Sequence, residues 1–197
     1  MRERLIAILI AAATSLAAHS EEPKISESLF YKGTINKSPI SMMLRIQSNK
    51  ASGRYIYDKY KIPIILSGEY NLNKITLADH DKERLALSSA TGDLVGVWSD
   101  GKNSQKIWLT PQSKSYKSII ESVTGSPQEI NIKFKGGAIQ NIKLLIPEES
   151  LVINFEDFNF DGYPDFAVLA AGGITNSSYL YYAYDPKEKN SPPYITA

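Results

Sequence analysis

The sequence contains no cysteine and only two histidines, His19 and His80. Without cysteine there can be no disulfide, no thiol nucleophile and no zinc site built from several Cys and His ligands. His19 lies in an N-terminal segment that we expect to be removed, so His80 is the one histidine left for a Ser-His-Asp arrangement. His80 stands among charged residues in a predicted turn at 78–82, with no identifiable serine partner. The sequence therefore argues against a hydrolase.

An excess of positive charge is also missing. Lys and Arg number 22 and Asp and Glu 21 in the whole chain, and both totals become 20 once residues 1–20 are removed. Nucleic acids and anionic membrane surfaces attract proteins that carry a positive field. A neutral chain argues against either as the main partner.

The one long apolar run lies at residues 5–18, after Arg2 and Arg4. It is shorter than the roughly 20 residues that span a bilayer, and the small residues Ala18 and Ser20 follow at the positions a signal peptidase reads. We therefore expect residues 1–20 to be a cleaved signal peptide. The mature protein is expected to be periplasmic or secreted, without a lipid anchor or other membrane attachment. The sequence does not predict its oligomeric state.

Helical periodicity is absent after the signal segment. Short apolar or alternating runs are instead separated by turn residues about every ten positions, which is typical of an antiparallel β-meander. The predicted strands of the N-terminal section, 21–110, cover residues 29–35, 40–47, 53–58, 62–68, 74–78, 84–87, 94–98 and 106–109. Asp100-Gly101 suits a two-residue hairpin turn in which both residues have positive φ. We expect an all-β protein of curved antiparallel sheets, propeller-like or sandwich-like, with little helix.

The rest of the chain divides into a linker at 111–127, a second β section at 128–185 and a polar tail at 186–197. Residues 116–123, at the end of the linker, fit either a short helix or a strand. In the second section, strands are predicted at 129–134, 139–146, 151–155, 166–170 and 179–184. The sequence leaves open whether the two β sections form one domain.

Ser-Gly-x-Tyr occurs twice in the N-terminal section, at residues 52–55 and 67–70, and residues 95–98 form a looser third copy. A glycine in this setting relieves crowding where a curved sheet bends. Trp98 and Trp108 are expected in the core. Among Tyr179, Tyr181, Tyr182 and Tyr184, some must face outward, and exposed tyrosines suit a binding surface.

The segment 157–165, with the sequence DFNFDGYPD, carries the clearest chemical signal. Oxygen-bearing side chains stand at positions 1, 3, 5 and 9 of this segment, and the glycine at position 6, Gly162, permits a sharp turn. Calcium prefers six to eight oxygen ligands. Clustered carboxylates repel one another without a cation. The predicted Ca²⁺ ligands are Asp157, Asn159, Asp161, the Tyr163 carbonyl and Asp165.

The loop is not an EF-hand, because Val168 takes the place of the glutamate at position 12 and the flanking segments are predicted strands. Glu156 is at most an outer ligand. The simpler alternative is an Asp-Gly hairpin whose Asp and Asn side chains only cap the turn.

Together with residues 181–185, this loop resembles the calcium loops of integrin-type (FG-GAP) repeats. More narrowly, residues 128–185 resemble a family of exported bacterial calcium-binding immunity proteins. That family protects cells against a peptidoglycan hydrolase delivered by a type IV secretion system and is similar in shape to periplasmic inhibitors of invertebrate-type lysozyme. The resemblance implies a partner-binding loop at Ser52, Gly53 and Tyr55. Lys50 replaces a tyrosine of the family pattern, and residues 67–70 match the pattern equally well.

The resemblance implies an exported calcium-binding protein, not an enzyme, that inhibits or gives immunity against a cell-wall hydrolase. The alternative is a calcium-stabilised structural or adhesion module with another partner. A third reading, an enzyme that uses Asp157, Asp161 and Asp165 directly, ranks last, because three acids within one turn suit an ion better than an acid/base pair spanning a substrate.

Overall fold

The computed structural model describes residues 22–80, 82–90, 92–147, 150–173, 176–186 and 194–196, and their regular secondary structure is almost entirely β-strand. The predicted all-β antiparallel fold is confirmed. The first eight strands are β1 (Lys24–Ile35), β2 (Ser38–Gln47), β3 (Lys50–Tyr57), β4 (Pro63–Asn71), β5 (Lys74–Ala78), β6 (Arg84–Ala90), β7 (Asp93–Ser99) and β8 (Ser104–Pro111). They are followed by a 3-10 turn, η1 (Tyr116–Ser118), and by β9 (Ile120–Ser126), β10 (Glu129–Phe134), β11 (Ile139–Lys143), β12 (Val152–Glu156), β13 (Asp165–Gly172), β14 (Ser177–Asp185) and β15 (Tyr194–Thr196).

Strands β1 to β8 form a closed barrel. Each strand pairs antiparallel with the next, and the last pairs with the first, from Tyr31 opposite Pro111 to Ile35 opposite Ile107. The interior of an eight-stranded barrel is just wide enough for side chains to fill. Alternate residues of each strand point inward, and they form one apolar cluster that includes Ile35, Leu77 and Leu109, each fully buried.

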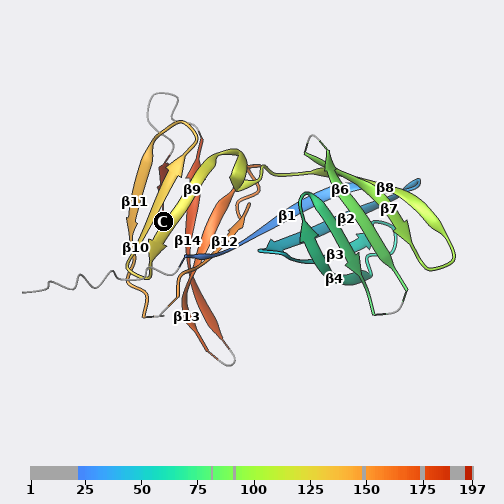
Figure 1. Cartoon of the computed structure of the whole chain (residues 1–197), viewed down its shortest axis with the longest axis horizontal. Coiled ribbons are helices and arrows are strands. Elements are labelled where there is room, and N and C mark those ends of the chain that lie inside the picture. The colour runs from blue at the N-terminus through green and yellow to red at the C-terminus, as the bar shows by residue number, and fades with distance from the viewer. Residues whose placement is uncertain are drawn as a thin grey trace, which may run out of the picture.

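One end of this barrel is closed by a polar cluster. The Tyr55 hydroxyl donates to the carboxylate of Glu83, and Trp98 Nε1 donates to Tyr55 Oη and to Glu83 Oε2, both at 3.1 Å. Because Tyr55 and Trp98 are both buried, their polar atoms need these partners. The opposite end of the barrel faces the second lobe of the molecule (Figure 1).

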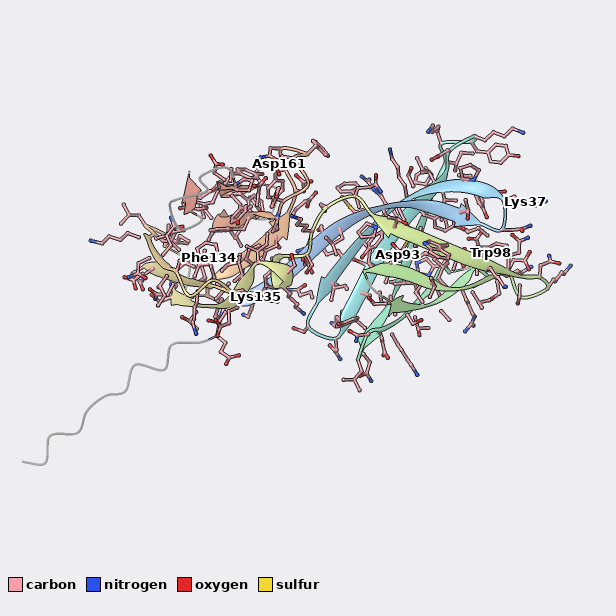
Figure 2. The ribbon with its side chains drawn as sticks, turned by 90° about the horizontal axis from the view of Figure 1, so that it is seen from above. Lys37, Asp93, Trp98, Phe134, Lys135 and Asp161 are labelled. Carbon is pink, nitrogen blue, oxygen red and sulfur yellow. The ribbon has the colours of Figure 1, made fainter. Side chains whose placement is uncertain are left out.

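Strand β1 belongs to both lobes (Figure 1). Its first residues, Lys24 to Glu27, pair in parallel with Val152 to Phe155 of β12, while its last residues close the barrel. The large sheet continues from β12 through β13 and β14 to β15. A separate three-stranded sheet, β9 to β11, supplies Ile130, Ile132 and Phe134 to a second apolar cluster, and Phe134 lies within this lobe in Figure 2. The second lobe is therefore a small sandwich that shares a strand with the barrel.

The segment boundaries differ from the expected ones. The expected linker, 111–127, contains η1 and all of β9, so residues 116–123 hold both a helical turn and the start of a strand. The polar tail contains β15, which pairs with Ala183 to Asp185 of β14. The predicted signal peptide lies outside the described residues.

Two local predictions were wrong. Asp100 is not among the residues with positive φ, and the turn between β7 and β8 spans residues 100–103 instead of two. The Asp100 carboxylate accepts hydrogen bonds from the backbone N–H groups of Lys102 and Asn103, so the side chain organises a longer loop. Trp108 is 57% exposed on the outside of the barrel, where its Nε1 donates to Asp93 Oδ2 at 3.0 Å.

In the part of the chain that the structure describes, we find no helix with the length and apolar character needed to cross a membrane.

Candidate functional site

The predicted calcium loop connects β12 to β13 and lies on the second lobe, where Asp161 is labelled in Figure 2. Two residues give it its tight winding. Phe160 has φ of 60° and Gly162 has φ of 87°, a region that glycine enters readily and other residues seldom adopt. The predicted role of Gly162 in a sharp turn is confirmed.

Asp157 stands at the start of the loop and is only 6% exposed. Its Oδ1 accepts a hydrogen bond from the backbone N–H of Asp161 at 3.1 Å, and its Oδ2 accepts one from Gly162 at 3.0 Å. Both carboxylate oxygens therefore point into the loop and hold its turn together.

Asp165 closes the loop and is 2% exposed. Its Oδ2 accepts hydrogen bonds from the backbone N–H groups of Phe158 and Asn159, at 3.1 and 3.3 Å, and its Oδ1 accepts one from Tyr184 at 2.9 Å. Burial raises the pKa of Asp165 above its ordinary value, the three backbone N–H groups lower it, and the negative charge of Asp161 raises it further. This carboxylate joins the loop to β14.

The middle of the loop is exposed and also internally bonded. Asn159 Oδ1 accepts from the Asp161 backbone N–H at 3.0 Å, Asp161 Oδ1 accepts from the Tyr163 N–H at 2.8 Å, and Asp161 Oδ2 accepts from Asn159 Nδ2 at 3.1 Å. All four side chains that are predicted to bind calcium therefore form hydrogen bonds within the loop, and that of Asp165 also bonds to β14.

The donor set of this loop is chemically suited to a hard cation, because every predicted ligand atom is an oxygen. In the arrangement described above, however, the carboxylates cap backbone N–H groups. Among the described residues no group of three or more His, Cys, Asp or Glu side chains is arranged to hold a metal ion. Calcium at Asp157, Asn159, Asp161, Tyr163 and Asp165 therefore stays a prediction.

The loop is also fixed against the barrel side of the molecule. The ring of Phe160 lies 6.4 Å from that of Phe30 on β1, measured between centroids. The Gly162 carbonyl accepts from the Lys114 backbone N–H at 2.9 Å, and Lys114 Nζ lies 4.0 Å from the centroid of the Tyr163 ring. The loop thus contacts the segment that joins β8 to η1.

The partner-binding loop implied at Ser52, Gly53 and Tyr55 does not exist as a loop. These residues lie within β3, between β2 and β4, and Tyr55 is fully buried inside the barrel. A Cβ on Gly53 would lie 2.9 Å from the Met42 side chain. The Ser-Gly-x-Tyr pattern therefore reflects strand packing, in which the tyrosine enters the core two residues after the glycine.

An exposed aromatic surface lies beside the calcium loop instead. Tyr179 and Tyr181 of β14 are 39% and 57% exposed, and Phe160 at the loop is 79% exposed. The ring of Phe158 meets that of Tyr181 edge-to-face, with centroids 5.2 Å apart. We call Phe158, Phe160, Tyr179 and Tyr181 the aromatic surface. Tyr182 and Tyr184, which follow on β14, are buried on the other face of the strand.

A polar cluster that was not predicted from the sequence lies where β1 passes between the lobes. Arg45 Nη2 donates to Ser26 Oγ at 3.1 Å and to Asn154 Oδ1 at 2.9 Å, and Ser26 also donates to Asn154. Burial raises the pKa of the nearby Glu156, while Ser28 and the positive charge of Arg45 lower it. Because its members come from β1, β2 and β12, only the three-dimensional pairing brings them together.

Glu27 lies on the opposite, inward-facing side of β1, where its Oε1 accepts from the Tyr116 backbone N–H at 2.8 Å. Burial raises its pKa above the ordinary value of 4.5, and the Ser115 hydroxyl, the Tyr116 N–H and the charge of Lys117 lower it less. The Glu27 carboxyl group therefore binds its proton more tightly in the folded state than in the unfolded state. Its contribution to the free energy of unfolding is complete below about pH 4.5 and is lost as the pH rises through the raised pKa.

We therefore expect Glu27→Gln to gain stability relative to the natural protein as pH rises from 4 to 7. Urea unfolding of both proteins at several pH values in this range measures the difference. A difference in free energy of unfolding that stays constant with pH would contradict the prediction.

Comparisons with protein-family models, with curated proteins and with solved structures found no match to this chain.

Proposed function

We propose that this chain is an exported binding protein without catalytic activity, which inhibits or gives immunity against a peptidoglycan hydrolase through its aromatic surface. The observation that carries the proposal is the placement of exposed rings beside an acidic loop. Tyrosine and phenylalanine are enriched in protein interfaces, and Tyr181 and Phe160 expose more than half of their surface. The partner class comes from the family resemblance of the loop.

Calcium has a specific place in this proposal. An ion held by Asp157, Asn159, Asp161 and Asp165 would fix the loop that carries Phe158 and Phe160. A surface that is ordered before association loses less conformational entropy on binding. The proposal therefore moves the partner contact from β3 to the face formed by β14 and the calcium loop.

The test uses the mature chain, residues 21–197, with lysozymes of several types and with cell-wall amidases, in the presence of Ca²⁺. We expect it to lower the rate at which one of these enzymes lyses cell walls. Tyr181→Ala should weaken that inhibition at least tenfold, as for a central aromatic contact. Tyr60→Ala is the matched control, because Tyr60 is 62% exposed on the barrel and lies outside the aromatic surface.

Two results would count against this proposal. The absence of inhibition across the whole panel would favour the alternative of a calcium-stabilised structural or adhesion module. Inhibition that Tyr181→Ala leaves unchanged, in a variant whose circular dichroism is that of the natural protein, would show that the partner contact lies elsewhere.

A further inference from the structure

A pocket with a volume of about 550 Å³ opens at the end of the barrel that faces the second lobe. Its wall is formed by the ends of barrel strands and by residues 113–118, which pass over the mouth. We call it the mouth pocket. The barrel below it is filled by side chains, so the pocket is a separate chamber between barrel and η1. Its volume lies within the range of small-molecule sites, which occur preferentially at barrel mouths and between domains.

About half of the residues that line the mouth pocket are apolar or aromatic, and most of the others are serines. Ile46, Ile75 and Leu94 line it from the barrel, and the rings of Tyr31, Tyr70 and Tyr116 also belong to the lining. Tyr116 is held in place by stacking on Phe155, with centroids 4.2 Å apart and planes inclined by 9°. The pocket can therefore enclose an apolar group against rigid rings.

Glu27 is the one carboxylate in this lining. It lies between Ile25 and Leu29 on the inward side of β1. In the described part of the chain it has no Lys or Arg within ion-pair distance, since the ion pairs found there are Lys61–Asp58 and Lys133–Glu121. Of the two lysines of the lining, Lys114 has its Nζ 4.0 Å from the Tyr163 centroid. Lys117 has its Nζ 5.9 Å from the Tyr116 centroid, and its charge acts on Glu27 from beyond ion-pair distance.

We propose that the mouth pocket binds a small organic cation, an amine on an apolar body, with Glu27 as its counter-ion. Glu27 already accepts hydrogen bonds from Ser115 and from the Tyr116 N–H, but a buried carboxylate charge remains costly unless a positive charge pairs with it. An ammonium group can supply that charge, and neighbouring tyrosine rings attract it further. An anionic ligand would meet the repulsion of Glu27. A metal ion would find a single carboxylate where it needs several oxygen ligands.

The raised pKa of Glu27 is consistent with this assignment, because burial disfavours the charged carboxylate more than Ser115, the Tyr116 N–H and the charge of Lys117 favour it. An ammonium group beside it would lower that pKa again. The proposal is independent of the aromatic surface, which lies on β14 and the calcium loop.

The test measures binding by calorimetry with three compounds of one shape. The compounds are 4-phenylbutylamine, 4-phenylbutanol and 4-phenylbutanoate, which are positive, neutral and negative at pH 7.5. We expect saturable binding of the amine, with the alcohol at least tenfold weaker and the carboxylate weaker still. Equal affinity for amine and alcohol, or binding of none of the three, would overturn the proposal.

Two variants locate the site. Glu27→Gln keeps an acceptor for the Tyr116 N–H and should remove the preference for the amine over the alcohol. Glu121→Gln makes the same change of charge at a side chain that is 49% exposed on β9, away from the pocket, and should leave the preference intact. An amine preference that persists in Glu27→Gln would contradict the proposal. If this variant does not fold, the comparison of amine and alcohol in the natural protein decides alone.

Discussion

Replacing Gly68 by alanine is expected to lower the free energy of unfolding by about 3 kcal/mol, at the upper end of what overpacking costs. A Cβ at this position would lie 1.9 Å from the backbone oxygen of Thr76 on the neighbouring strand. Backbone atoms cannot move aside as the end of a flexible side chain can, so β4 and β5 would have to separate. Urea unfolding of the purified variant measures the effect.

Gly136→Ala is the matched control for this substitution. Gly136 lies in the turn between β10 and β11, and no heavy atom comes within 4 Å of a Cβ built there. We expect a change of no more than about 0.5 kcal/mol. Similar effects of the two substitutions would show that Gly68 does not mark a close approach of strands.

The second large effect is expected at Asp165. In Asp165→Ala the backbone N–H groups of Phe158, Asn159 and Tyr184 lose their acceptor at a buried position. Hydrogen bonds to a charged group contribute about 1.5–3 kcal/mol each, and a buried donor left without an acceptor carries a further cost. We expect the free energy of unfolding to fall by about 3 kcal/mol or more, in buffer with chelator so that loss of a metal ion does not contribute.

Asp161→Ala provides the comparison within the same loop. Asp161 is exposed, and its backbone partner is the N–H of Tyr163. A loss of about 1 kcal/mol or less is expected in the same chelating buffer. If Asp161→Ala and Asp165→Ala were equally destabilising without metal, the loop would depend on its charges as a group and not on the buried hydrogen bonds of Asp165.

The sequence predicted the strands of the barrel well, because each has its own alternation and each pair is joined by a short turn. It did not predict that the meander closes into a barrel through the pairing of its last strand with its first. The pairing of Tyr31 with Pro111 joins residues that are distant in the chain, and no local pattern records it. The double membership of β1 was missed for the same reason, since its first residues pair with β12, a strand that follows the whole barrel in the sequence.

Individual side chains show why a pattern does not determine a site. Tyr55 belongs to a sequence that the family resemblance treats as a loop, yet strand alternation places its ring inside the barrel. Trp108 is large and apolar, but its neighbours Ile107 and Leu109 occupy the inward positions, so it faces outward. For the calcium loop, the glycine at position 6 of the pattern predicted the sharp turn at Gly162. It did not reveal that Asp165 would be committed to three backbone N–H groups.

The central claim is that the loop from Asp157 to Asp165 binds calcium, and thermal unfolding of the mature chain with Ca²⁺ and with chelator tests it most directly. Saturation at about 100 times the dissociation constant adds about 2.7 kcal/mol of stability, which corresponds to a rise in Tm of about 5–11 °C for a chain of this size. Asp161→Asn, a change on the exposed side of the loop, should remove most of that rise while leaving the Tm in chelator nearly unchanged. A Tm that is the same with Ca²⁺ and with chelator in the natural protein would contradict the account.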